Sequence, residues 1–390
     1  MSSHAIRMMA TGAKYLRENP QDALTHARTI LPWYFHNRVR ALALPWEQGV
    51  WGLVDGRAQN PRFITIKPTF RCNLRCSFCR FVANGQVFGK PDSTPEEMWL
   101  NLIDEVAPHK PYFSITGGEP LIYPAIGSLL RRMKHHGLHV AMVTNATLLE
   151  RKAEEILDAA PASLQISIDG EKETHDELRM VSGTFDKAQA GLERLNELKR
   201  QKKMTAPLVI INSVITGDNF RNLTKVAKVA KELGATALNF QHFWFLSKNV
   251  VDNHNHQWGD CHPVDMEEVG STDTQGVDTD ALWAEMQRVQ REAELPIGFY
   301  PELTKEELHI YYNEPDKIIQ PRVPGCGWLQ TSIFPNGDVA PCFNHIVGNI
   351  GETPFMDIWN NQPFREHRMR LAQNGPYSVC ARCCAYFRYD

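Results

Sequence analysis

The sequence predicts an α/β fold built around a parallel β-sheet. From about residue 62 onward, short β-branched or aromatic runs alternate with longer amphipathic segments of helical period. The short runs are bounded by Gly, Pro and Asn, as strands usually are. Regular alternation of strand and helix predicts parallel strands joined by right-handed crossovers. With 390 residues, the chain has room for one large domain and a smaller one.

Six of the short runs are predicted strands. They cover Phe63–Lys67, Tyr112–Thr116, His139–Thr144, Ser163–Ile168, Leu208–Ile215 and Ala237–Phe243. The helices predicted between them cover Thr94–Val106, Ala125–His136, Leu149–Ala159, Phe185–Lys202 and Phe220–Leu233, and another amphipathic helix is predicted over 281–293. Thr94 is a good N-cap for the first of these helices, because a proline and two acidic residues follow it.

Changes in composition divide the chain into segments. The expected segments are an N-terminal helical extension (1–60), the alternating α/β domain (61–294) with a polar insertion (246–280), a linker (295–325) and a small C-terminal domain (326–390). Long loops in compact enzymes are often lids, so we expect the insertion to be a loop that covers the substrate.

The N-terminal extension and the polar insertion each contain side chains that could have a functional role. The extension contains Trp33, Tyr34, Phe35, Arg38 and Arg40, which would suit a membrane surface or a substrate lid, although simple packing against the main domain is favoured. The insertion contains four side chains that could ligate zinc, but their spacing matches no standard site. They are His254, His256, Cys261 and His262.

Composition excludes several classes of function. The net charge is −3 and 22% of residues are charged, so nothing indicates binding to nucleic acid or to an anionic membrane. The sequence has no apolar run long enough for a transmembrane helix and no clear signal peptide. Nine cysteines, clustered at metal-ligand spacings, predict a reducing, cytoplasmic location.

The most informative motif is a triple-cysteine loop directly after the first predicted strand. Cys72, Cys76 and Cys79 have the spacing C-x3-C-x2-C, with no fourth cysteine nearby. An ordinary iron–sulfur cluster is held by four thiolates. Three thiolates would leave one iron open, and an open coordination position marks a catalytic metal centre. A zinc site and three structural thiols are the alternative interpretations.

This spacing resembles that of the radical S-adenosylmethionine (SAM) superfamily. Phe78 directly precedes the last cysteine, where the family places an aromatic residue against the adenine of SAM. The run Ser114-Ile-Thr-Gly-Gly-Glu-Pro120 resembles the second motif of the family. By that resemblance, Gly117 and Gly118 would let the backbone approach the methionine end of SAM, because glycine lacks a Cβ. Glu119 would lie by the SAM ammonium group.

The resemblance also implies a fold and further cofactor contacts. It implies a partial (β/α)6 TIM-like barrel, in which active sites lie at the carboxyl ends of the strands. Asn145, Ser167 and Arg179 follow or end predicted strands and are candidates to bind the ribose and carboxylate of SAM. Asp169 is expected near the substrate or as a residue that holds a loop.

A second cysteine set lies in the C-terminal domain. Asn336-Gly337 between apolar runs predicts a hairpin, which would place Cys326 and Cys342 on neighbouring strands. Cys380 and Cys383 would complete a closed four-thiolate site, for which spacing alone allows zinc or iron.

The second set resembles the SPASM/twitch extension of radical SAM enzymes, which binds auxiliary iron–sulfur clusters. Only five of the seven cysteines of the full pattern are present, so one auxiliary 4Fe-4S cluster is expected. The fifth cysteine, Cys384, is an alternative ligand to Cys383.

Together these motifs predict a radical SAM oxidoreductase. Reductive cleavage of SAM at a 4Fe-4S cluster would give a 5′-deoxyadenosyl radical that abstracts hydrogen from a small metabolite, causing oxidation, epimerisation or rearrangement. The auxiliary cluster would accept an electron or bind the substrate. An external low-potential donor such as flavodoxin or ferredoxin is expected. The alternatives are a maturase acting on a ribosomally made precursor peptide and, more distantly, a non-catalytic zinc-binding module.

Overall fold

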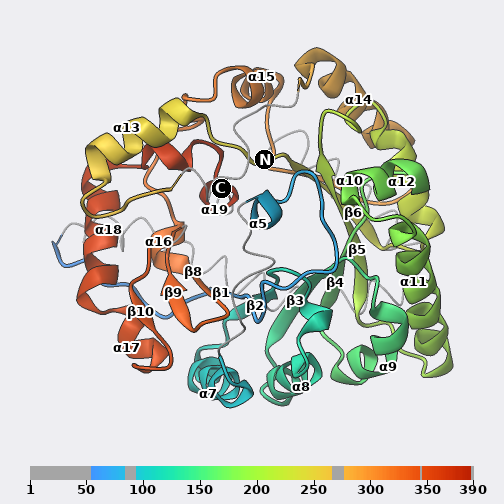
Figure 1. Cartoon of the computed structure of the whole chain (residues 1–390), viewed down its shortest axis with the longest axis horizontal. Coiled ribbons are helices and arrows are strands. Elements are labelled where there is room, and N and C mark those ends of the chain that lie inside the picture. The colour runs from blue at the N-terminus through green and yellow to red at the C-terminus, as the bar shows by residue number, and fades with distance from the viewer. Residues whose placement is uncertain (1–53, 84–93, 266–275, 343–344, 388–390) are drawn as a thin grey trace.

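A computed structural model describes residues 54–83, 94–265, 276–342 and 345–387. Most of the predicted N-terminal extension, with its aromatic and basic stretch, lies outside these residues. The described chain forms one curved ten-stranded sheet in the order β10-β9-β8-β1-β2-β3-β4-β5-β6-β7, which does not close, with helices around its outer side (Figure 1). Among the described helices, none is long and apolar enough to cross a membrane.

Eight of the strands, from β8 to β7 in this order, pair in parallel, whereas β9 and β10 form an antiparallel edge. Their bounds are β1 Phe63–Ile66, β2 Tyr112–Ile115, β3 His139–Thr144, β4 Ser163–Ser167, β5 Leu208–Ile215, β6 Ala237–His242, β7 Ile297–Tyr300, β8 Gln330–Ile333, β9 Asp338–Ala340 and β10 Gly348–Asn349. The six predicted strands are confirmed as β1 to β6, and the predicted α/β fold with them.

The α-helices follow the strands as crossovers or decorate the C-terminal part. Their bounds are α5 Arg80–Ala83, α7 Glu96–Val106, α8 Ile126–His135, α9 Leu149–Ala159, α10 Lys172–Arg179, α11 Thr184–Gln201, α12 Leu223–Glu232, α13 Lys248–Trp258, α14 Thr279–Glu292, α15 Lys305–Asn313, α16 Cys326–Leu329, α17 Phe355–Trp359, α18 Gln362–Asn374 and α19 Cys384–Phe387. The predicted crossover helices correspond to α7, α8, α9, α11, α12 and α14.

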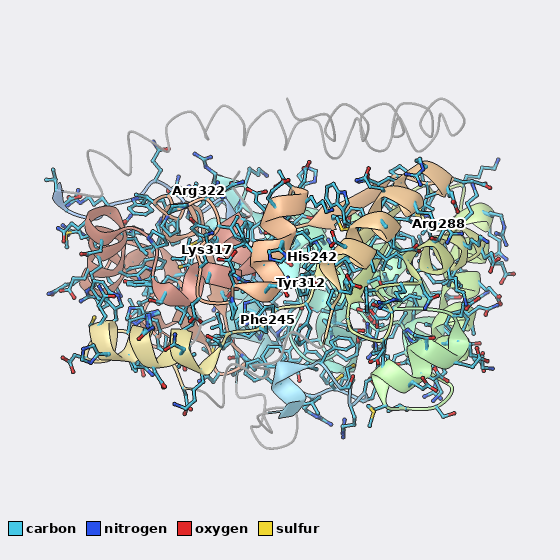
Figure 2. All side chains as sticks on the ribbon, turned by 90° about the horizontal axis from the view of Figure 1, so that it is seen from above. His242, Phe245, Arg288, Tyr312, Lys317 and Arg322 are labelled. Carbon is cyan, nitrogen blue, oxygen red and sulfur yellow. The ribbon has the colours of Figure 1, made fainter. Side chains whose placement is uncertain are left out.

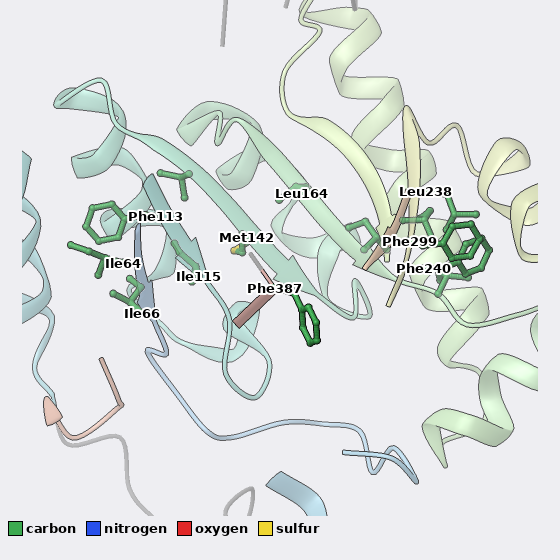
Figure 3. Close-up of a cluster of buried hydrophobic side chains, with 14 of the residues drawn as sticks. Ile64, Ile66, Phe113, Ile115, Met142, Leu164, Leu238, Phe240, Phe299 and Phe387 are labelled. Carbon is green, nitrogen blue, oxygen red and sulfur yellow. The ribbon is translucent and has the colours of Figure 1, made fainter. Parts of the chain in front are cut away.

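The main core lies between the sheet and the outer helices. Alternate residues of β1 and β2, such as Ile64, Ile66 and Phe113, are fully buried on the outer face, as the period of a strand requires (Figure 3). The inner face of the sheet is polar at its centre, where Asn212 Nδ2 donates a 2.9 Å hydrogen bond to Gln165 Oε1. The inner face is therefore built to line a site, and the outer face to hold the fold.

Three elements differ from the sequence prediction. The predicted linker contains β7, a seventh parallel strand, followed by α15. The predicted insertion loop contains the regular helix α13, which begins at a Ser247 N-cap. Thr94 is not the cap of α7, because the cap position falls on Pro95; instead the Thr94 hydroxyl donates a 2.8 Å hydrogen bond to the Pro335 carbonyl. Thr94 thus ties α7 to the C-terminal hairpin.

The C-terminal domain joins the barrel sheet directly. Strand β8 pairs in parallel with β1, so Phe63 lies opposite Gln330 and Ile66 opposite Ile333. The predicted hairpin is confirmed: β8 and β9 are antiparallel and Gly337 takes a φ of 87° in the turn. Its cysteines, however, are not on neighbouring strands, because the first begins α16 and the second follows β9.

One buried arginine holds these C-terminal elements together. Arg368, in α18, donates hydrogen bonds of 2.7 Å to the Gly327 and Trp359 carbonyls and 3.1 Å to the Gly56 carbonyl. Its guanidinium also lies 4.1 Å from the ring centroid of Phe364. Because Gly327 follows a candidate ligand, Cys326, the arginine positions that cysteine as well as the helices.

We predict that Arg368→Leu lowers the free energy of unfolding by more than about 3 kcal/mol, because buried carbonyls lose a charged donor. A urea titration followed by circular dichroism measures this change. Arg288→Leu is the matched control: Arg288 is an exposed residue of α14 that pairs with Glu292, and its loss should cost at most about 0.5 kcal/mol. Equal effects of the two substitutions would contradict the assigned role.

Candidate functional site

The triple-cysteine loop rests on the Gly-Gly-Glu-Pro turn. The Gly118 amide donates a 2.9 Å hydrogen bond to the Thr69 carbonyl, and the Glu119 amide donates one of 2.8 Å to the Arg71 carbonyl. A Cβ on Gly118 would lie 2.2 Å from that Arg71 oxygen, and Gly117 has a φ of 123°. Both glycines are therefore required by the contact with the cysteine loop itself. Their predicted approach to SAM stays a prediction.

Glu119 joins the ends of two strands. Its side chain is 1% exposed and accepts hydrogen bonds from the amides of Leu121 (2.9 Å) and Asn145 (2.8 Å) and from the Thr144 hydroxyl (2.7 Å). Burial raises the pKa of this carboxyl, and the three donors oppose that rise. The carboxyl group thus fixes the turn after β2 against the end of β3. Pairing with the SAM ammonium group remains a prediction.

Two of the three cysteines of the loop, Cys72 and Cys76, have hydrogen-bond donors beside their sulfur atoms. The Leu74 amide lies 3.4 Å from Cys72 Sγ, and Arg179 Nη1 lies 3.6 Å from Cys76 Sγ. Burial raises the pKa of the Cys72 thiol to about 11, so iron must displace its proton on binding. Hydrogen bonds to sulfur are a usual way of tuning an iron–sulfur cluster. The loop therefore fits the group that the sequence predicts.

Other predicted SAM contacts lie around the same loop. Asn145 Nδ2 is 3.0 Å from Asn73 Oδ1 and 4.0 Å from Cys72 Sγ. The Phe78 ring lies 5.2 Å from the guanidinium carbon of Arg179. Ser167 is the last residue of β4, at the same edge of the sheet. Their contacts with SAM are untested and stay predictions.

A buried ion pair, between Arg179 and Asp169, lies beside Cys76. Arg179 Nε donates a 2.7 Å hydrogen bond to Asp169 Oδ2, while Asp169 Oδ1 accepts one of 2.9 Å from the Val214 amide. The Asp169 amide points at His175 Nδ1, and burial lowers the pKa of that imidazole to about 4. Asp169 therefore holds the ends of β5 and α10 in place. Asp169 was expected near the substrate or as a residue that holds a loop, but its link through Arg179 to Cys76 was not predicted, because charged residues are usually exposed.

The five C-terminal cysteines meet the cluster loop at one cavity of about 330 Å³. Phe78 of the cluster loop lines it, together with Cys326, Cys342, Cys380, Cys383 and Cys384. The thiol of Cys384 hydrogen-bonds to Cys383 and, with burial, raises the pKa of Cys383. The structure thus brings the C-terminal cysteines and one residue of the triple-cysteine loop, Phe78, to the same cavity.

Arg382 fixes the C-x2-C turn to the segment predicted as a linker. Its guanidinium, 1% exposed, donates hydrogen bonds to the carbonyls of Tyr311 (2.6 Å), Ile310 (2.8 Å) and Glu314 (2.8 Å). These residues belong to α15 or directly follow it. The predicted linker is therefore a platform for the auxiliary cysteines. Sequence reasoning missed it because arginine between two cysteines gives no packing signal.

The polar insertion packs on the C-terminal domain. His254 Nε2 lies 2.9 Å from His262 Nδ1, and the His262 ring stacks on Tyr377 at 4.8 Å. Tyr377 in turn accepts a backbone hydrogen bond from Cys380. The prediction of a loop over the barrel is wrong for α13, a helix whose buried positions include His254. Within the described residues, no group of three or more His, Cys, Asp or Glu side chains could hold a single metal ion.

Comparisons with known proteins match both halves of this site. The radical SAM superfamily model matches residues 66–230, and the SPASM iron–sulfur cluster-binding domain model matches residues 325–384. The chain is 31% identical over 336 residues to an AdoMet-dependent heme synthase of Methanosarcina barkeri, covering 82% of this chain and 88% of the relative. It is 24% identical to a PqqA peptide cyclase of Granulibacter bethesdensis, covering 83% and 80%.

Solved structures share the fold. SuiB of Streptococcus suis bound to S-adenosylmethionine superposes with a TM-score of 0.57 at 20% identity, covering 80% of this chain and 68% of that one. A second solved structure, histidine-tagged anSMEcpe with bound AdoMet, gives a TM-score of 0.52 at 20% identity, with coverage of 78% and 79%. The open parallel sheet with its C-terminal extension is therefore a known arrangement.

We predict that Arg179→Lys keeps the iron but slows SAM cleavage by about 10–100-fold, the usual cost of losing a partner that orients a metal ligand. Lysine keeps the charge but cannot reach Asp169 and Cys76 together. Iron content, the electron paramagnetic resonance of the reduced cluster and 5′-deoxyadenosine formation measure the three effects. Arg194→Lys, in an exposed pair with Glu154, is the control. An unchanged resonance and rate would contradict the role of the pair.

Proposed function

Because the chain belongs to the radical SAM superfamily and ends in a SPASM domain, we propose that it abstracts hydrogen from a small metabolite bound in the shared cavity. The observation that carries the proposal is the lining of that cavity. Phe78 of the cluster loop and all five C-terminal cysteines border it. A molecule held there would reach the SAM side and the auxiliary cluster at once.

The residues fit the cofactors of this family, which are 4Fe-4S clusters and SAM. In the proposal, Cys72, Cys76 and Cys79 hold the catalytic cluster. The auxiliary 4Fe-4S cluster is held by Cys326, Cys342, Cys380 and Cys383, with Cys384 as the alternative to Cys383. When bound and reduced by an external donor such as flavodoxin or ferredoxin, the catalytic cluster and SAM supply the 5′-deoxyadenosyl radical.

The remaining residues bind and orient. Glu119 holds the turn that supports the cluster loop and is proposed to meet the SAM ammonium group. Gly117 and Gly118 keep that turn close to the loop. Phe78, Asn145, Ser167 and Arg179 are proposed to contact the rest of SAM, and Arg179 also donates to Cys76. The auxiliary cysteines are proposed to hold a cluster that takes an electron from the substrate or binds it.

The size of the cavity favours a small molecule. A volume of about 330 Å³ is at the lower end for small-molecule sites. The relative at 31% identity is a heme synthase by name, and heme is a metabolite and not a peptide. The competing proposal is a maturase for a precursor peptide. A cavity of this size would accept a peptide substrate if only one of its residues entered. It is supported by the PqqA peptide cyclase and by SuiB, which has been solved bound to the precursor peptide SuiA.

A non-catalytic zinc-binding module explains fewer features of the site than a radical SAM enzyme does. It would explain a closed set of cysteines, but not the Gly-Gly-Glu-Pro turn built against the triple-cysteine loop.

The catalytic cluster is tested by changing Cys72, Cys76 and Cys79 together to Ala. We predict that anaerobically reconstituted protein loses about half of its iron and all SAM cleavage, since two cubanes share the iron of the chain. Iron analysis and 5′-deoxyadenosine formation with dithionite provide the measurements. The wild-type chain is the reference, and circular dichroism checks folding. Formation of 5′-deoxyadenosine by the triple variant would refute the assignment.

The substrate class is tested with deuterium. Radical abstraction moves a substrate hydrogen into 5′-deoxyadenosine, so a fully deuterated cell extract reports its source as a gain in mass. We predict deuterium transfer from the fraction below about 1 kDa after proteins and peptides have been removed, because the cavity is of small-molecule size. Protease treatment of the extract is the control and should not lower the transfer. Transfer from the peptide fraction alone would establish the maturase instead.

A further inference from the structure

We infer that the exposed part of the triple-cysteine loop docks an acidic, low-potential electron-carrier protein. This donor surface consists of Arg71, Arg75 and Met180. The inference rests on the proposed function, in that an external donor must reduce the catalytic cluster. It adds the place where that donor binds and the residues that hold it.

The loop carries positive charge only. From Pro68 to Cys79 it contains two arginines and no Asp or Glu. Arg71 is exposed, and its side chain forms no ion pair or hydrogen bond with another described residue. Arg75 is half-buried, and its Nη1 donates hydrogen bonds to the carbonyls of Leu74 (2.7 Å) and Cys72 (3.1 Å). Two cations therefore flank Cys72, the first ligand of the predicted cluster.

Met180 adds exposed apolar surface beside the loop. It is 62% exposed, one of three large apolar side chains that are exposed within the described part of the chain. It directly follows α10, and the end of this helix is bonded to the loop: the Arg75 amide donates to the Arg179 carbonyl (3.3 Å) and the Ser77 amide to the Leu178 carbonyl (3.0 Å). Arginine and methionine are enriched in protein–protein interfaces, whereas Asp and Glu are depleted. The composition of the donor surface is therefore that of an interface.

The acidic residues around the loop do not cancel its charge. Glu119 and Asp169 are at most 1% exposed, and both bind neighbouring groups. Glu177 is exposed near the end of α10 that meets the loop, and Glu150 of α9 is followed directly by the exposed Arg151. The donor surface thus keeps an excess of positive charge, for which an acidic partner is the matching chemistry.

The position of the surface favours an electron carrier over other acidic partners. Cys72 and Cys79 are partly exposed, so a protein docked here lies close to the ligands of the cluster. Electron transfer between proteins slows steeply with distance, and its complexes use small interfaces, as this surface would provide. The carrier gives up one electron, a flavodoxin hydroquinone becoming its semiquinone, and the cluster of the proposed function receives it.

The first test measures docking without electron transfer. The full chain, with its clusters reconstituted anaerobically, is titrated calorimetrically with oxidised flavodoxin and, in parallel, with oxidised ferredoxin. We expect Arg71→Glu to weaken binding of the carrier at least about fivefold at low salt, because it reverses a charge of the interface. The difference should fall below about twofold at roughly 0.5 M salt, where charges a few ångströms apart are already screened.

A matched control has the same change of charge elsewhere. Arg288 is an exposed residue of α14. Figure 2 shows α5 (light blue), which directly follows the loop, at the lower edge of the ribbon, and Arg288 on the opposite, upper side. Arg288→Glu should change the affinity by less than about twofold, because its distance from the donor surface exceeds the range of a screened charge.

Met180 is tested separately from the charges. Met180 has a φ of 56°, a conformation that asparagine adopts readily, so Met180→Asn removes the apolar surface without straining the backbone. We expect it to weaken binding about threefold at low and high salt alike, because an apolar contact is not screened.

The second test measures reduction of the cluster by stopped-flow absorbance. Photoreduced flavodoxin should reduce Arg71→Glu at least about fivefold more slowly than wild type at low salt. The methyl viologen radical cation, a small reductant that needs no docking surface, should reduce the two proteins at rates within about twofold of each other. Iron content and circular dichroism establish that the variant holds its clusters, and Arg71→Gln replaces Arg71→Glu if it does not.

Three outcomes would overturn the inference. They are no binding of either carrier to wild type at low salt, equal weakening by Arg71→Glu and Arg288→Glu, and reduction of Arg71→Glu that is slow with methyl viologen as well as with flavodoxin. The last would place Arg71 in the support of the cluster instead of in a docking surface. The proposed function fails separately, if wild type forms no 5′-deoxyadenosine with dithionite.

Discussion

The parallel pairing of β8 with β1 is the constraint on which the rest of the site depends. It makes the C-terminal domain a continuation of the barrel sheet, with Phe63 opposite Gln330, and the cavity is lined from both halves, by Phe78 and by the C-terminal cysteines. Backbone hydrogen bonds at both ends of the pair, from Arg62 to Leu329 and from Lys67 to Ile333, fix the register of the two strands. The cavity lies between the two halves that this pairing joins.

Buried arginines also hold the parts of the site in place. Arg179, Arg368 and Arg382 are each at most 7% exposed, and each donates to groups beside a candidate cluster ligand. A charge buried in this way is costly unless its donors are satisfied, so each arginine tolerates only one arrangement of its surroundings. Cysteine loops have little core of their own, and the arginines give them the rigidity that a cluster site requires.

The barrel strands and both cysteine sets could be predicted from the sequence, but the way in which the barrel and the C-terminal domain are joined could not. The strands β1 to β6 were predictable because their apolar runs are bounded by turn residues. The hairpin of β8 and β9 was predicted from its turn, but the pairing of β8 with β1 was not, because the two strands are distant in the chain. Helix α13 was missed because one of its buried positions is His254, which reads as polar. The buried pair of Asp169 and Arg179 was hidden for the same reason: charged residues are usually exposed.

The choice between Cys383 and Cys384 can be argued from a feature common to both cysteine groups. In the barrel loop, the Cys79 amide donates a 3.1 Å hydrogen bond to the Cys76 carbonyl, which closes the C-x2-C turn. The Cys383 amide donates a bond of the same length to the Cys380 carbonyl. Cys384 instead begins α19, and its carbonyl accepts a hydrogen bond from the Tyr300 hydroxyl. The shared turn supports Cys383 as the ligand, and leaves Cys384 as a neighbouring thiol in the wall of the cavity.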